Sequence, residues 1–172
     1  YNFFITYANI DQFKVPLQGK QSSKFKVDQN ILDRWIVSKL NSLIKKVTES
    51  LEKYDACAAA WMIEDFVGNL STWYVRRSRD RVGTSASSEE DKNGFYQTLY
   101  TVLITLSKLL APFIPFLSEE MFKNLTVEES VHLQDWPVAS KSLIDNELEE
   151  KIVLVRQICE LGHAKRKEAG IK

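Results

Sequence analysis

The amino-acid sequence predicts an all-α fold, an antiparallel bundle of four to five long helices. Glycine and proline are scarce, with six and four among 172 residues, so few tight turns are available. Apolar residues recur every three or four positions over long stretches, the spacing of amphipathic helices, and no alternating strand of useful length stands out. With 44% hydrophobic and 27% charged residues, the chain has the composition of a globular domain with a sizeable core.

The first half of the chain predicts three helical segments. Residues 1–10 have the apolar content of the end of a buried helix, and residues 11–29 indicate a linker. A long helix is expected from about residue 30, and after a break around Tyr54-Asp55 a second one over residues 56–82. The apolar stripe of the first is Leu32, Ile36, Leu40, Leu43, Val47 and Leu51, and that of the second is Ala60, Ile63, Val67, Leu70 and Tyr74.

The second half begins with a polar stretch. Residues 83–93 show no apolar periodicity and predict a mobile loop. The next helix is expected to begin near Gly94 and to run to residue 110. Pro112 and Pro115 follow it, and because proline has no backbone N–H, we expect a kink or a break with a restart there.

The remaining residues complete the expected domain plan. Residues 126–144 indicate a connection, and a last helix is expected over about 145–169. We therefore divide the chain into an entry helix with linker (1–29), a helical bundle (30–144) and a C-terminal helix (145–172). Because the sequence opens without an initiator methionine in what looks like the middle of an element, we expect it to be a piece of a longer protein.

Composition excludes several classes of function. Lys and Arg number 23 and so do Asp and Glu, so any site for a polyanion must be a local cluster. Two cysteines (Cys57 and Cys159) and two histidines form neither a disulfide framework nor a zinc motif, and they favour a reducing, cytoplasmic compartment. No apolar run reaches the roughly 20 residues that span a bilayer. No glycine-rich phosphate loop, nucleophile–base pair or metal set is present, so we predict no catalytic or metal residue.

The densest chemical feature is the run WYVRRSRDR at residues 73–81. Its last six residues hold four arginines and one aspartate, a local charge of +3 in a neutral chain. Arg77 and Arg81 continue the stripe of the preceding helix, so we expect them at a solvent-accessible end of the bundle. Guanidinium groups next to an indole are typical of single-stranded nucleic-acid recognition. The candidate residues are Trp73, Arg76, Arg77, Arg79 and Arg81.

Structural explanations of the same residues remain open. Arginines near a helix C-terminus complement the helix dipole, Asp80 can pair with Arg76 or Arg77, and Trp73 can belong to the core. A second basic cluster over residues 162–172 adds the candidates Lys165 and Arg166, although a solvated last helical turn accounts for them equally.

Five segments together resemble the anticodon-binding domain of class I aminoacyl-tRNA synthetases. They are LDRWI (32–36), WYVRRSR (73–79), LAPFIPFLSEE (110–120), SVHLQDWP (130–137) and RKEAGIK (166–172). The second, fourth and fifth look specifically like those of isoleucyl-tRNA synthetases. One departure is visible, because this chain has Val82-Gly83 where the family often has Phe-Trp.

The resemblance implies a longer parent enzyme that activates isoleucine with ATP and magnesium and transfers it to tRNA. The HIGH and KMSKS signatures and the editing domain are absent from this sequence, so it would supply tRNA recognition and hold no cofactor of its own. Its implied partners are an isoleucine-accepting tRNA and the catalytic and editing domains of the same parent, without a membrane. The arginines of the cluster would bind phosphates, with stacking by Trp73 and help from Lys165 and Arg166.

Two alternatives remain at this point. The first is the same domain of a valine-type synthetase, against which the WYVRRSR run argues. The second is a helical protein-interaction scaffold whose arginine cluster docks an acidic partner.

Overall fold

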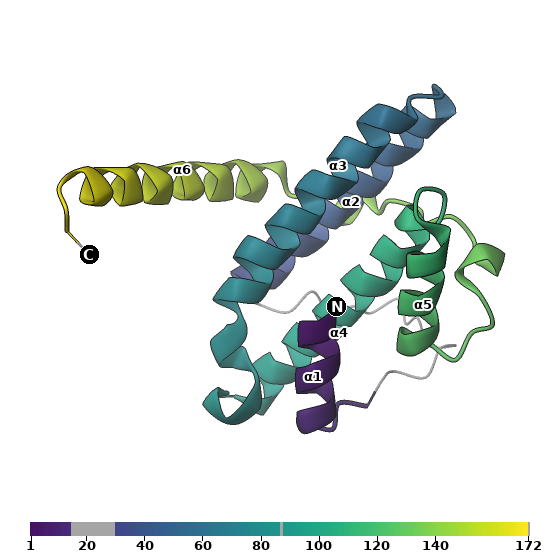
Figure 1. Cartoon of the computed structure of the whole chain (residues 1–172), viewed down its shortest axis with the longest axis horizontal. Coiled ribbons are helices and arrows are strands. Elements are labelled where there is room, and N and C mark those ends of the chain that lie inside the picture. Colours follow the sequence, from purple (N-terminus) through teal and green to yellow (C-terminus); the bar gives the residue numbers. More distant parts are fainter. Residues whose placement is uncertain (15–29, 87, 172) are drawn as a thin grey trace.

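The computed structural model describes residues 1–14, 30–86 and 88–171, and all regular structure in these ranges is helical, which confirms the predicted all-α class (Figure 1). The predicted linker over residues 15–29 lies outside the described residues. The α-helices are α1 (Asn2–Ile10), α2 (Ile31–Glu52), α3 (Ala56–Asn69), α4 (Glu89–Leu110), α5 (Pro115–Leu125) and α6 (Asn146–Glu168).

Helices α2 and α3 form an antiparallel hairpin around which the bundle is built (Figure 1). The Asn30 side chain caps α2 by accepting a hydrogen bond from the Leu32 N–H at 3.0 Å. The chain reverses at Tyr54, whose φ of 60° is left-handed, and Asp55 then caps α3 by accepting from the Ala58 N–H at 2.9 Å. The predicted break at residues 54–55 is therefore confirmed.

The core lies between α2, α3 and α4, and the predicted stripe of α2 faces it. Ile36, Leu40, Leu43 and Val47 are all buried. The predicted stripe of α3 is partly wrong, because Ala60 and Val67 are exposed. Their places are taken by Ala59 and Phe66, which are 0% and 2% exposed. With α3 in this orientation the Phe66 ring is buried, and its burial removes much more apolar surface from water than burial of the Val67 side chain would.

The predicted helix over residues 56–82 does not stay an α-helix. After Asn69 it widens into a π-helical turn, η1 (Leu70–Val75), and two 3-10 turns follow, η2 (Arg79–Arg81) and η3 (Gly83–Ser85). The Thr72 hydroxyl donates to the Gly68 carbonyl at 2.7 Å, the oxygen to which a regular α-helix directs the Thr72 N–H. Such a bond favours a local change of the helical turn.

The predicted loop over residues 83–93 is wrong in its second part, because α4 begins at Glu89 and not near Gly94. Ser88 caps the helix by accepting from the Asp91 N–H at 3.3 Å. The first turn of α4 holds three acidic residues, which the helix dipole stabilises but which show no apolar periodicity. The sequence pattern therefore indicated a loop where the chain is helical.

The two prolines break the chain as expected. Helix α4 ends at Leu110, the chain turns through Pro112, and α5 restarts with Pro115 at its first position, where the missing N–H costs nothing. Beyond α5 the chain runs back along α2 through η4 (Val131–Leu133) and η5 (Lys141–Leu143). On this return path the Trp136 indole donates to the Thr48 hydroxyl at 2.8 Å.

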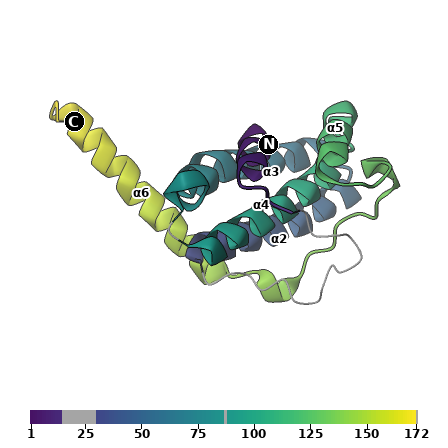
Figure 2. The ribbon, with the colours of Figure 1, turned by 90° about the horizontal axis from the view of Figure 1, so that it is seen from below.

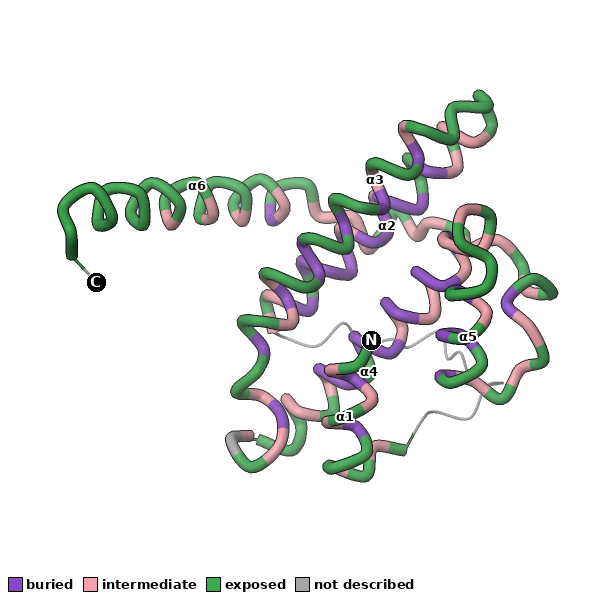
Figure 3. The backbone as a smooth tube through the Cα atoms, in the orientation of Figure 1, coloured by how far each residue is buried: buried purple, intermediate pink, exposed green. Residues whose placement is uncertain are grey.

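Helix α6 confirms the predicted last helix and projects from the bundle (Figures 1 and 2). Its first turn is fastened to α2, since the Glu149 carboxylate accepts hydrogen bonds from the Ser38 and Ser42 hydroxyls and Arg34 pairs with Asp145 at 3.1 Å. Exposure increases along its length, and residues 160–171 are all exposed (Figure 3).

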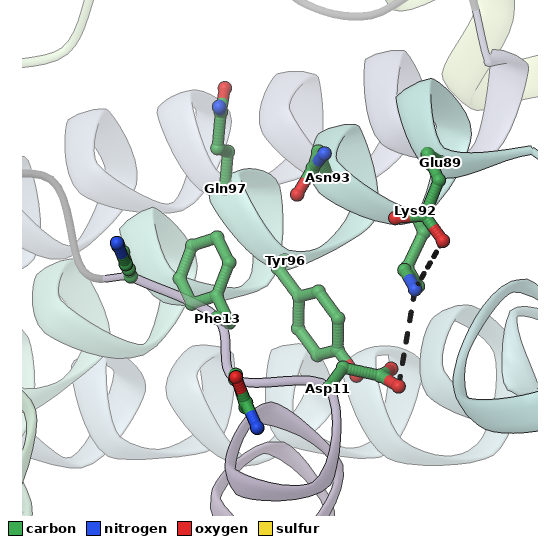
Figure 4. A pocket seen from close by; sticks show the side chains of 9 residues that line it. Asp11, Phe13, Glu89, Lys92, Asn93, Tyr96 and Gln97 are labelled. Atoms are coloured by element: carbon green, nitrogen blue, oxygen red, sulfur yellow. Dashed lines mark hydrogen bonds and ion pairs between the residues drawn. The ribbon is translucent and has the colours of Figure 1, made fainter.

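A polar joint connects α1 with α4 and η3, beside a hollow of about 300 Å³ (Figure 4). The Asp11 carboxylate accepts hydrogen bonds from the Tyr96 hydroxyl at 2.6 Å and from the Gly83 N–H at 2.9 Å, and Lys92 lies 4.0 Å away. Burial raises the pKa of Asp11, but these partners outweigh it and hold the pKa below its ordinary value. Gly83 has a φ of +65°, which glycine adopts without strain.

We expect the D11N variant to be less stable than the wild type at pH 7 by about 1 kcal/mol, since it loses charge-assisted hydrogen bonds. Because the folded-state pKa of Asp11 is lowered, its contribution is present above the unfolded-state pKa of about 3.9 and is lost as the pH falls below that value. Urea unfolding followed by tryptophan fluorescence at several pH values should show the two proteins converging in acid. D80N, at an exposed aspartate, is the control, and parallel pH profiles of D11N and wild type would contradict the prediction.

Candidate nucleic-acid interface

Three of the four clustered arginines are exposed at the end of α3 that lies opposite the 54–55 turn (Figure 1). Arg76, Arg77 and Arg79 extend into solvent, and within the described ranges none of them forms an ion pair with a carboxylate. Asp80 is exposed too and pairs with neither Arg76 nor Arg77. This corner of the molecule is therefore a concentrated positive patch on a chain without net charge.

Trp73 lies in the π-helical turn η1, half-buried against the core. The guanidinium carbon of Arg77 lies 5.3 Å from the centroid of its ring, a cation–π contact between neighbouring turns of the same helix. A second guanidinium, that of Arg156 in α6, lies 5.1 Å from the same centroid. The indole thus contacts two cations at once.

Sequence reasoning missed Arg156. Its guanidinium Nη1 donates to the Asn69 side-chain oxygen, so it bridges α6 and the end of α3. The one signal in the sequence is its spacing, because Arg156 follows Leu148 and Ile152 at intervals of four, on the side of α6 that faces the bundle. A charged residue at a position where an apolar one is expected indicates a specific partner, but the pattern does not identify that partner.

Arg81 does not lie where the sequence placed it. Its side chain is only 9% exposed and binds two carboxylates. Its Nη1 and Nη2 donate to the two carboxylate oxygens of Asp33 at 2.7 Å each, and its Nε and Nη2 donate to those of Asp91 at 2.8 Å each. The expectation that Arg81 sits at a solvent-accessible end is therefore wrong, and its role is to hold the fold together.

The surroundings of this ion cluster explain why Arg81 turns inward. Asp33 is completely buried, and the Tyr74 hydroxyl donates to its Oδ1 at 2.6 Å. Burial disfavours the charge of Arg81, but hydrogen bonds from Arg81 to Asp33 and Asp91 raise its pKa above the ordinary value. The Phe95 ring lies 5.4 Å from the Arg81 guanidinium carbon. Three elements (α2, η2 and α4) thus meet at one side chain.

The two candidates in the last helix lie near its free end, away from Trp73. Lys165 is exposed and pairs with Glu168 at 2.7 Å, while Arg166 is exposed and donates to His163 Nδ1 at 2.8 Å. The structure therefore leaves both in solvent in the last turns of α6, at the end of this helix that projects away from the bundle (Figure 2).

Two other kinds of feature are absent from the part of the chain that the structure describes. No group of three or more His, Cys, Asp or Glu side chains is placed to hold a metal ion. None of the described helices combines the length and the apolar character that crossing a membrane requires.

The known proteins to which this chain is similar are tRNA ligases. The profile of the family described as the anticodon-binding domain of tRNA ligase matches residues 33–172. Over the whole chain, the sequence is 48% identical to the isoleucine–tRNA ligase of Clostridium novyi and 49% identical to that of Dehalococcoides mccartyi strain CBDB1. The chain spans 17% of the length of each of these relatives.

A solved structure shares the fold. The agnB2 LeuRS of Agrobacterium radiobacter K84, crystallised in a ternary complex with tRNA and LeuAMS, superposes on 84% of this chain with a TM-score of 0.55 and 20% identity, and the match covers 16% of that protein. The chain belongs to the family of anticodon-binding domains of tRNA ligases. Its matched relatives are isoleucine–tRNA ligases, and the matched region is the anticodon-binding part of such an enzyme, not the catalytic part.

We expect R81A to lower the free energy of unfolding by about 3–5 kcal/mol, because the substitution leaves the buried Asp33 carboxylate without its partner. R79A, at an exposed position two residues earlier, should change it by less than about 0.5 kcal/mol. Urea unfolding followed by far-UV circular dichroism measures both.

A second substitution tests whether the unpaired Asp33 carboxylate causes this loss of stability. Adding D33N to R81A removes the unpaired charge and should restore part of the lost stability. Equal stability losses in R81A and R79A would show that the Arg81 ion cluster does not hold the fold.

Proposed function

We propose that this chain holds the anticodon arm of an isoleucine-accepting tRNA and thereby positions the tRNA for the catalytic domain of an isoleucine–tRNA ligase. The observation that carries the proposal is the corner at the end of α3, where Arg76, Arg77 and Arg79 are exposed without a carboxylate partner among the described residues and Arg77 lies against Trp73. Membership of the anticodon-binding family supports it, as does the tRNA bound in the structurally similar LeuRS complex.

In this proposal the arginines supply affinity through the phosphate backbone. Arg76, Arg77 and Arg79 present planar, permanently charged guanidinium groups that bind phosphate oxygens with paired hydrogen bonds. Such contacts release counterions and position the RNA without reading its bases. Lys165 and Arg166 on the free end of α6 contribute further charge.

In this proposal Trp73 is not an open surface on which a base of the RNA stacks. Two guanidinium groups already lie against its ring, and its half-buried indole packs on the core. This arrangement favours Trp73 as the support that orients Arg77 toward the RNA.

The parent enzyme in this proposal activates isoleucine with ATP and magnesium and transfers it to tRNA in the cytoplasm. ATP and magnesium are bound by the catalytic domain, which together with the editing domain is the partner of this chain within the parent. The isoleucine-type identity is favoured over the valine type by the relatives that match the chain.

We expect R77A to bind a tRNA transcript less tightly and to lower the slope of log K against log salt by about 0.7–0.9, since one counterion-releasing contact is lost. Fluorescence anisotropy at several salt concentrations measures both quantities. The free energy of unfolding should change by less than about 0.5 kcal/mol, as at other exposed positions. K53A, at an exposed lysine beside the 54–55 turn, is the charge-matched control.

The outcomes separate the competing functions. Wild-type affinity in R77A, R76A and R79A would overturn the proposed RNA site. If the chain binds acidic peptides through these arginines but not tRNA, it is a protein-interaction scaffold instead.

We expect the isolated chain to form no aminoacyl-adenylate from isoleucine and ATP, because its sequence contains neither the HIGH nor the KMSKS signature. Exchange of labelled pyrophosphate into ATP is the assay, with a complete isoleucine–tRNA ligase as the positive control. Isoleucine-dependent exchange by the purified chain would contradict this.

A further inference from the structure

The guanidinium of Arg156 is a partly buried cation for which the described residues offer no carboxylate partner. A guanidinium has five N–H donors, and one of them, on Nη1, donates to the Asn69 oxygen. Taking a cation out of water is unfavourable unless an anion or enough acceptors compensate it. Arg156 therefore has charge and hydrogen-bonding capacity that the fold alone does not use.

Asn69 holds Arg156 in a fixed place. The Asn69 amide nitrogen donates to the backbone carbonyl of Asp65 at 2.7 Å and to its carboxylate at 2.9 Å. This fixes the orientation of the amide, so that its oxygen faces Arg156. The Asp65 carboxylate lies on the other side of this amide and forms no ion pair with Arg156.

Arg77 places a second positive charge beside the first. The two guanidinium carbons lie 5.3 Å and 5.1 Å from the centroid of the same Trp73 ring, so their separation is at most the sum of these distances. This upper limit is close to the Debye length of roughly 8–10 Å at physiological ionic strength, so the two charges repel each other only weakly and under partial screening. An anion bound by both guanidinium groups would remove this repulsion.

The position of Arg156 along α6 means that its repulsion with Arg77 affects how firmly α6 is held on the bundle. The anchors of α6 on α2 lie in its first turn, at Asp145 and Glu149. Beyond Arg156, Cys159 is the one α6 residue up to Glu168 that is partly buried, and the others are exposed. Arg156 is therefore the outermost hydrogen-bonded contact between α6 and the bundle, and a change at this contact alters how firmly the helix is held.

We propose that Arg156 and Arg77 together bind the phosphate backbone of the tRNA, and that this binding fastens α6 to the bundle. The inference rests on the proposed function and extends it, since it adds the bundle-facing part of α6 to the RNA site and couples the docking of the helix to RNA binding. The ligand chemistry is a phosphodiester strand, whose successive negative charges suit two guanidinium groups supported by one indole.

The test compares R156Q and R156K with wild type, using an isoleucine-accepting tRNA transcript as the probe. R156Q removes the charge, and we expect about a tenfold loss of affinity together with a salt slope lower by about 0.7–0.9. R156K keeps the charge, so the salt slope should stay near the wild-type value. It loses the planar guanidinium group, which can donate to Asn69 and to a phosphate at the same time. K53Q is the matched control at an exposed, distant position.

Hydrogen exchange gives the readout that a purely structural role would not produce. In wild type, the amides of residues 157–168 should exchange several-fold more slowly when tRNA is bound. In R156Q this protection by tRNA should disappear, while R77A should weaken it in proportion to the lost affinity. Exchange in the free proteins shows whether each variant still folds, and R156M, which also removes the charge, replaces R156Q if the latter does not.

The outcomes distinguish the two proposals. If wild type and R77A both fail to bind the transcript, the proposed function fails. If R77A loses affinity while R156Q keeps the affinity, the salt slope and the protection of α6, the RNA site stands and the role of Arg156 is overturned.

Discussion

The ion cluster of Arg81, Asp33 and Asp91 joins the start of α2, the turn η2 and the first turn of α4 through buried or partly buried charges. Asp33 is completely buried at the start of α2, where an unpaired carboxylate would be strongly unfavourable. The Arg81 guanidinium satisfies it with two hydrogen bonds and also binds Asp91 in the first turn of α4. The turn that follows the π-helical segment is thereby fixed to both long helices of the core. Arg76, Arg77 and Arg79 directly precede this fixed turn in the chain.

One consequence is a division of roles among arginines that are nearly adjacent in the chain. Arg81 turns inward and neutralises the core carboxylates, and so it is unavailable to a ligand. Arg76, Arg77 and Arg79 face solvent, with Trp73 supporting Arg77 from the side of the core. The buried ion cluster of Arg81 and the exposed positive patch of Arg76, Arg77 and Arg79 thus lie on one short stretch of the chain. Pre-positioned cations of this kind bind phosphates with little further ordering.

A second consequence concerns α6, which reaches far beyond the bundle. It is tied down at its start by Ser38 and Ser42 and farther along by Arg156, which contacts the same indole as Arg77. The arginine-rich corner and the projecting helix therefore both contact one side chain, Trp73. The relatives are about six times as long as this chain, so α6 and the corner work within a much larger enzyme in the proposed function.

Local chemistry in the sequence determined the all-helical class, the buried stripe of α2, the reversal after residue 53 and the break at the two prolines. Each depends on residues within a turn or two of one another, and the family resemblance rests on such short runs. The sequence also located the arginine-rich corner, because four like charges in a neutral chain are visible without coordinates.

Whether Arg81 faces solvent or the core depends on Asp33, which lies in another helix, and only the tertiary structure brings the two together. The same holds for the face of α3, where Phe66 displaces Val67 from the core, and for Arg156, whose partners Asn69 and Trp73 lie on a distant segment. Periodicity states which residues share a side of a helix, whereas burial and ion pairing depend on what that side meets.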